Sequence, residues 1–84
     1  MTDRPMQYKV VLDAAGLDGA RSAAGVLSEL YEPAPLAVTQ FEAGPAGFRI
    51  EAYFESAPDI AEVQQAIDCT GAEGLSPVRL EMVP

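Results

Sequence analysis

Hydrophobic residues recur along this chain at two spacings, which together predict four strands and two helices. Every second residue is apolar between residues 48 and 55, an alternation typical of a strand with one buried face and one wetter face. Stretches rich in β-branched and aromatic residues predict three further strands, at residues 8–12, 36–42 and 78–82.

The two predicted helices show apolar residues three and four positions apart. In the first, Asp18 is expected to cap the N-terminus, and Pro33 and Pro35 end the helix. The second is expected to open at residues 56–59 with Ser56 as its capping residue, and to end at a left-handed Gly71. The predicted buried stripes are Ala20, Ala23, Ala24, Leu27, Leu30 and Tyr31 in the first helix, and Ile60, Val63, Ala66 and Ile67 in the second.

The order strand, helix, strand, strand, helix, strand predicts an α+β fold of the ferredoxin-like βαββαβ type. Right-handed crossovers place both helices on one face of a four-stranded antiparallel sheet with strand order 4-1-3-2. The second and fourth strands are then the edges, which agrees with Pro35, Pro77 and Pro84 at their ends. We expect residues 1–84 to form a single domain with one modest core.

The residue inventory excludes most catalytic chemistry. The chain has no His and one Cys, which rules out Ser–His and Cys–His pairs, His- or multi-Cys zinc sites and an internal disulfide. Its glycines lack the spacing of a phosphate-binding loop. Cys69 is expected to be a small core-lining residue, with a reactive thiol as the alternative. Carboxylate pairs such as Glu51 and Glu81 arise readily by chance, so we expect no catalytic residue, no cofactor site and no metal site.

A formal charge of −8, from thirteen acidic and five basic residues, narrows the possible partners. Phosphate backbones and anionic lipid would be repelled, so we expect neither nucleic acid nor membrane as a partner. The charge either keeps a small domain soluble or attracts a basic protein. A start without an apolar signal segment, and the absence of any apolar run of about 20 residues, make the cytoplasm the expected location.

The sheet face that the helices would leave uncovered, here called the open face, is the candidate binding surface. Tyr and Arg are favoured anchors in protein interfaces, and the open face should carry both. The alternative is that it is merely solvated, or is covered by a part absent from this chain. The candidate partner-binding residues are Lys9, Val11, Arg49, Glu51, Tyr53, Arg79 and Glu81, and Asp13 shares their face.

Three stretches, at residues 8–10 (YKV), 37–42 (AVTQFE) and 50–54 (IEAYF), the last followed by Pro58 and Asp59, carry a family resemblance. They resemble the N-terminal domain of the bacterial methyltransferase that modifies large-subunit ribosomal protein eleven, most closely in its alphaproteobacterial versions. The resemblance covers essentially all 84 residues. It implies a non-catalytic, ferredoxin-like substrate-recognition domain that binds the ribosomal protein.

In that family a linker joins this domain to a Rossmann-like domain, which binds S-adenosylmethionine and methylates amino groups of the substrate. That catalytic domain is absent from this chain, so the resemblance implies no cofactor here. We expect a monomer, either an excised domain or a stand-alone relative, and the start at Met1 and end at Pro84 favour excision. The alternative function is a stand-alone regulatory or small-molecule-binding domain on the same scaffold.

Overall fold

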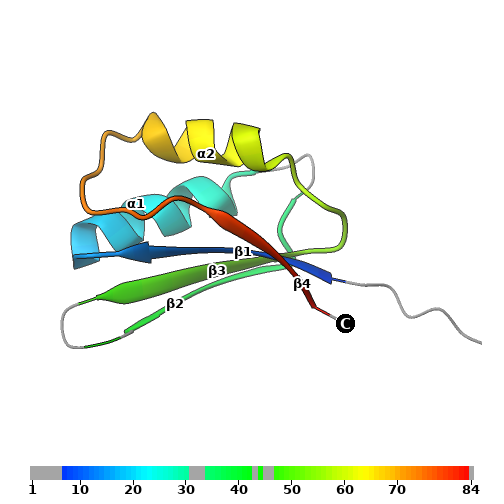
Figure 1. Cartoon of the computed structure of the whole chain (residues 1–84), viewed down its shortest axis with the longest axis horizontal. Coiled ribbons are helices and arrows are strands. Elements are labelled where there is room, and N and C mark those ends of the chain that lie inside the picture. The colour runs from blue at the N-terminus through cyan, green and yellow to red at the C-terminus, as the bar shows by residue number, and fades with distance from the viewer. Residues whose placement is uncertain (1–6, 31–33, 43, 45–46, 84) are drawn as a thin grey trace, which may run out of the picture.

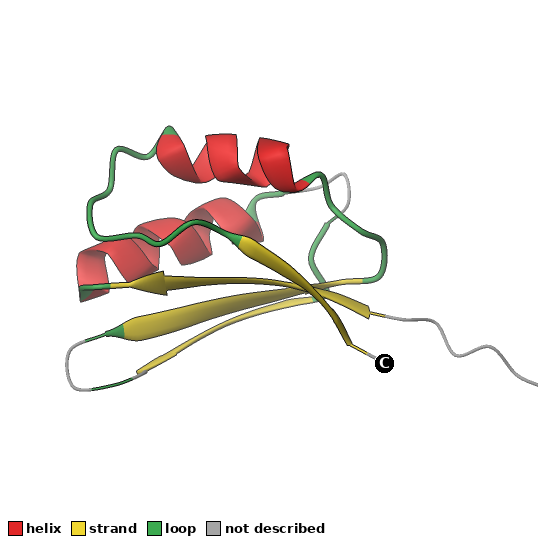
Figure 2. Ribbon diagram, viewed as in Figure 1, coloured by secondary structure: helices red, strands yellow, loops and turns green. Residues whose placement is uncertain are grey.

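Four antiparallel strands form one sheet, and two helices lie together on one of its faces (Figures 1 and 2). The computed structural model describes residues 7–30, 34–42, 44 and 47–83. The strand order is β2-β3-β1-β4, which read from the other edge is the predicted 4-1-3-2, so the ferredoxin-like α+β architecture is confirmed. The elements are β1 (Gln7–Ala14), α1 (Leu17–Ser28), β2 (Ala37–Glu42), β3 (Phe48–Phe54), α2 (Ile60–Asp68) and β4 (Arg79–Val83).

The core fills the space between the sheet and the helices. The pairing register sets Val10 opposite Ala52 and Leu12 opposite Ile50, so alternate residues of the two central strands point toward the helices together. The helices contribute the predicted stripes, with Ala24, Leu30, Ile60 and Ala66 only partly buried, while Tyr31 lies outside the described residues. The buried core comprises Val10, Leu12, Ala14, Ala20, Ala23, Leu27, Ile50, Ala52, Phe54, Val63 and Ile67.

Both helices begin at a different residue from the one predicted. The N-cap of α1 is Gly16, and Asp18 lies within the first turn, where its charge still suits the positive end of the helix dipole. The N-cap of α2 is Asp59, whose carboxylate accepts hydrogen bonds from the amides of Ala61 (2.9 Å) and Glu62 (3.4 Å). A helix capped by Ser56 would need Ala57 as its first residue, but a proline disfavours helical backbone in the residue before it, so Pro58 keeps Ala57 out of the helix.

Cys69 is exposed, which corrects the prediction that it lines the core. It follows the last residue of α2 and lies two positions beyond the buried Ile67. Two positions correspond to about 200° around a helix, so Cys69 points away from the core. The turn that follows contains Gly71 with φ +71°, as predicted from its conformational freedom.

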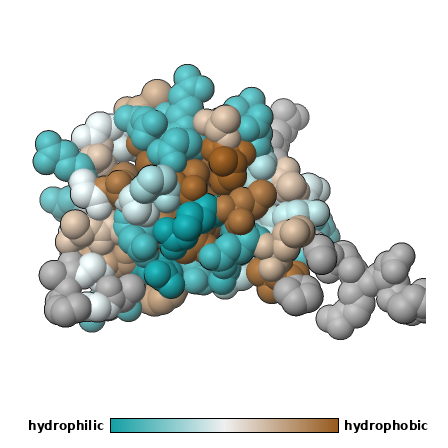
Figure 3. Space-filling model, viewed as in Figure 1, coloured by the Kyte–Doolittle hydropathy of each residue, from teal (hydrophilic) through white to brown (hydrophobic). Residues whose placement is uncertain are grey.

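The two edge strands are much more exposed than the central ones. Toward its C-terminus β4 diverges from the helical layer (Figure 1), and Leu80 and Met82 are 39% and 62% exposed. In the view of Figure 3, hydrophobic residues reach the surface between hydrophilic ones on the side where β4 ends. Pro35 and Pro77 precede the edge strands as predicted, whereas Pro33 and Pro84 lie outside the described residues.

Candidate functional site

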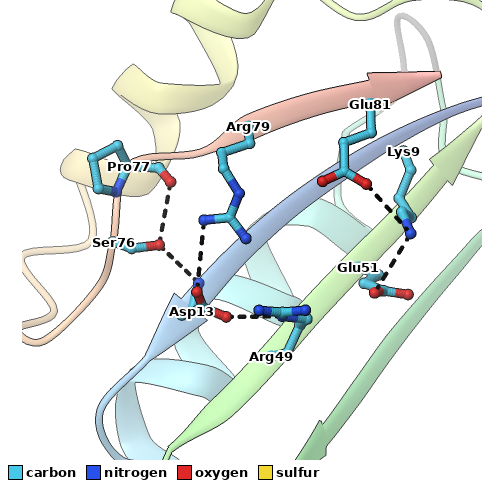
Figure 4. Close-up of polar contacts among 8 residues, drawn as sticks. All are labelled: Lys9, Asp13, Arg49, Glu51, Ser76, Pro77, Arg79 and Glu81. Atoms are coloured by element: carbon cyan, nitrogen blue, oxygen red, sulfur yellow. Dashed lines mark hydrogen bonds and ion pairs between the residues drawn. The ribbon is translucent and has the colours of Figure 1, made fainter. Parts of the chain in front are cut away.

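The candidate residues come together on the open face, opposite the helices. The register sets Lys9 opposite Tyr53 and Glu81, and Asp13 opposite Arg49. Val11 lies between them, opposite Glu51 and Arg79. Three strands therefore build one surface, with β1 in the middle (Figure 4).

Asp13 is the centre of the first of two ionic clusters. Its Oδ1 accepts a hydrogen bond of 3.0 Å from Nε of Arg49, and its Oδ2 lies 3.6 Å from a terminal nitrogen of Arg79. Its main chain is also held, because the amide of Asp13 donates to Oγ of Ser76 (2.8 Å) and the amide of Ser76 donates to the Asp13 carbonyl (2.8 Å). The hydrogen bond from Arg49 is the main reason that the pKa of Asp13 lies below its ordinary value.

Lys9 is the centre of the second cluster. Its Nζ lies 3.7 Å from Glu51 and 3.6 Å from Glu81, and 5.9 Å from the centroid of the Tyr53 ring. The Tyr53 hydroxyl donates a hydrogen bond of 2.8 Å to Glu51, and this bond raises the pKa of Tyr53. The Glu51 side chain is 14% exposed against 50% for Glu81, so the pair of Lys9 with Glu51 is the better shielded of the two.

Val11 is 2% exposed although no helix covers its face, which corrects its prediction as a partner contact. Glu51 and Arg79 flank it across the sheet, and long charged side chains shield apolar surface with their alkyl parts. Val11 therefore lies buried under the charged side chains of the two clusters and is not accessible to a partner.

The open face continues onto β2, where it carries a residue that is absent from the seven candidates. Phe41 lies opposite Arg49 and is 45% exposed. Ala37 and Thr39 occupy the same face of β2, since they alternate with the partly buried Val38. The alternation along residues 37–42 predicts that Phe41 lies on the open face once the register with β3 is known.

Within the described strands, the residues on the open face carry no net charge. Its three basic residues, Lys9, Arg49 and Arg79, all pair with its three acidic residues, Asp13, Glu51 and Glu81. The formal charge of −8 therefore belongs to the rest of the chain. The long-range electrostatic field of the molecule therefore arises from the helices and loops, whereas the open face presents a fixed local arrangement of positive and negative charges.

Two hollows lie away from the open face. One of about 460 Å³ lies between the first turn of α1 and the turn after α2, and is lined by Gly16, Asp18, Gly19, Thr70 and Glu73, among others. The other, of about 280 Å³, lies between α2 and the segment before β4. Among the described residues no group of three or more His, Cys, Asp or Glu side chains could hold a metal ion. Within the same residues, neither helix is long and apolar enough to cross a membrane.

Comparison with known proteins adds no relative. No protein-family model matches the chain, and no curated protein matches its sequence. The functional argument therefore depends on the fold, on the open face and on the resemblance carried by the strands of the sheet.

Proposed function

We propose that this chain is a non-catalytic protein-binding domain whose partner docks on the open face. The observation that carries the proposal is the composition of that uncovered face. It presents Phe41 and Tyr53 beside ordered ion pairs, and aromatic and Arg side chains are the usual anchors of protein interfaces. Because Asp13 and Lys9 already hold their partners in place, little side-chain freedom remains to be lost on docking.

The partner that fits best is a basic protein. The charge of −8 attracts such a protein from a distance, and the neutral open face then selects it by local matching. The resemblance to the N-terminal domain of the ribosomal protein methyltransferase favours large-subunit ribosomal protein eleven as this partner, in the cytoplasm. In that arrangement a separate domain supplies S-adenosylmethionine and the methyl transfer, and this domain supplies recognition. A short flexible linker would hold the substrate at an effective concentration of about 1 mM.

The test is titration of the ¹⁵N-labelled 84-residue chain with the ribosomal protein, with amide shifts as the readout. Shifts should cluster on β1, β3 and β4 and extend to Phe41 on β2. Replacing Tyr53 with Ala should weaken binding by about 1–3 kcal/mol, which is roughly 5- to 150-fold in affinity. Phe41→Ala should weaken it as well.

Leu17→Ala is the matched control, because Leu17 is 42% exposed, close to the 45% of Phe41, but lies on α1. It should leave the affinity unchanged. An unrelated protein of similar positive charge separates docking from general electrostatic attraction. Amide shifts confined to the helices, or no shifts at all, would remove the support for the open face.

A small-molecule-binding domain is the second candidate, and the hollow of about 460 Å³ is the observation in its favour. Asp18 and Glu73 are among the residues that line this hollow, so it suits a neutral or cationic compound better than an anion. A compound bound there would move the amides of Gly16, Gly19 and Thr70 and leave those of β3 in place. The same spectra therefore distinguish the two functions.

A further inference from the structure

The outer edge of β4 has no strand beside it in the described structure. β4 pairs with β1 on one side and ends the sheet on the other. Its residues combine apolar exposure on the helical side, at Leu80 and Met82, with exposed charges on the open face, at Arg79 and Glu81. The backbone groups at such an edge are available to pair with another strand.

We infer that this edge pairs with the same edge of a second copy, in an antiparallel register centred on Leu80. In that register Arg79 of each copy lies opposite Glu81 of the other, and the two Leu80 side chains meet between these pairs. Met82 of each copy comes to lie beside Val78 of the other. Opposite charges and apolar residues placed directly across from each other stabilise an antiparallel pair.

The neighbouring symmetric registers are unfavourable. Centring the pair on Glu81 sets two carboxylates directly opposite each other, and centring it on Arg79 does the same with two guanidinium groups. In a register shifted by a single residue, the second copy would carry its helices on the opposite side of the sheet. A two-fold axis perpendicular to the sheet cannot relate two copies arranged in that way. The charges of β4 therefore select one register.

The other edge strand, β2, has no such self-complementary charges. β2 runs from Ala37 to Glu42 and has Glu42 as its one charged residue, so no self-pairing of β2 sets opposite charges together. One self-complementary edge per copy gives a closed dimer, whereas two different complementary edges would give open-ended chains. The dimer is a continuous eight-stranded sheet with all helices on one side, in contrast to the monomer expected from the sequence.

The two copies also repel each other, because each carries a charge of −8. This charge lies away from the open face, so it acts over longer distances than the contact between Arg79 and Glu81. At about 0.15 M salt the Debye length is about 8 Å, against about 30 Å at 0.01 M. When the salt concentration is raised from about 0.01 M to about 0.15 M, self-association should therefore become stronger, whereas attraction to a basic partner should become weaker. The opposite salt dependence separates this inference from the proposed function.

Sedimentation equilibrium of the 84-residue chain, from about 0.02 to about 1 mM protein in about 0.15 M NaCl, is the direct test. The expected result is a reversible monomer–dimer equilibrium. Glu81→Arg and Arg79→Glu, each alone, should weaken the dimer at least about tenfold, since each sets like charges opposite one another. Glu62→Arg makes the same charge change as Glu81→Arg on the exposed surface of α2 and should not weaken it.

A mixture of Glu81→Arg and Arg79→Glu chains makes the test independent of how either variant behaves alone. In the mixed pair every position again faces an opposite charge, so dimers should reappear in the mixture. A chain that stays monomeric at about 1 mM and about 0.15 M NaCl would overturn the inference. A dimer that neither single charge reversal weakens, or a mixture that stays monomeric, would overturn it equally.

Discussion

Replacing Asp13 with Asn tests whether the ion pairs of the open face stabilise the fold. The Asn side chain has nearly the same shape, and its oxygen can still accept the hydrogen bond from Arg49. The two hydrogen bonds between Asp13 and Ser76 use the main chain of Asp13, so they do not involve its carboxylate. The substitution therefore removes one negative charge from the junction of β1, β3 and β4 and leaves the geometry in place.

The expected loss is modest because water reaches this cluster. The two ion pairs measure 3.0 and 3.6 Å, and the side chains of Asp13, Arg49 and Arg79 are 41–42% exposed. Exposed pairs contribute about 0.2–1 kcal/mol each, so the variant should lose about 1 kcal/mol of unfolding free energy. For a domain of this size that lowers the melting temperature by about 4–8 °C.

The loss should depend on pH in a defined direction. The pKa of Asp13 is lower in the folded protein than its ordinary value of 3.8, chiefly because Arg49 donates a hydrogen bond to the carboxylate. The stabilisation is therefore fully present above this ordinary, unfolded value and disappears as the pH falls through the lower folded pKa. Wild type and variant should differ constantly from neutral pH to about pH 5 and should converge at lower pH.

Urea unfolding followed by far-UV circular dichroism measures this difference. With a slope of about 1 kcal/mol per molar urea, the midpoint should shift by about 1 M at neutral pH. Asp68→Asn is the matched control, because it removes the same charge at the exposed C-terminal end of α2, where a carboxylate opposes the helix dipole. Equal midpoints for wild type and Asp13→Asn at neutral pH, or a difference that persists unchanged in acid, would refute the reasoning.

Substitutions at three further positions test other contacts of the structure. Asp59→Ala removes the acceptor for two amides of α2 and should lower the unfolding free energy by about 1 kcal/mol in urea titrations, whereas Asp59→Asn should restore most of it. Leu27→Ala leaves a cavity at a fully buried position and should lower the melting temperature much further, for a loss of about 2–5 kcal/mol. Glu51→Gln should lower the pKa of Tyr53 toward its ordinary value, because a neutral amide no longer favours the protonated phenol, and ¹³C shifts of the labelled ring report it.

The architecture could be predicted from the sequence because it follows from local periodicity and chain order. The alternation along residues 48–55 assigns both faces of β3, the short connection to β2 extends that assignment to its neighbour in the sequence, and the alternation within β1 and β4 assigns their faces. The placement of the candidate residues on one face follows from the same alternation. The contacts between individual side chains do not follow from the alternation. The contact of Asp13 with Arg49 depends on the register, and a shift of one residue would turn every side chain to the other face.

The predictions that failed concern boundaries and accessibility. Ser56 and Asp59 are both good capping residues, and only the backbone around Pro58 decides between them. Cys69 lies just past the end of α2, where a shift of one or two residues in the helix boundary changes which side it faces. The burial of Val11 depends on where its charged neighbours lie, which hydrophobic periodicity does not encode.

The separation of charge between the two sides of the molecule bears on how docking would proceed. The neutral open face lies on one side of the sheet. Of the exposed acids, Glu62 and Asp68 lie on α2, Glu29 directly follows α1 and Glu73 follows α2. These acids lie on the opposite side of the sheet from the open face, so their field is weaker there than at the helices, and salt screens it further. The acidic side can therefore raise the rate of encounter with a basic partner without fixing its orientation. Orientation and residence time depend on Tyr53, Phe41 and the paired charges, so salt should change the association rate much more than the dissociation rate.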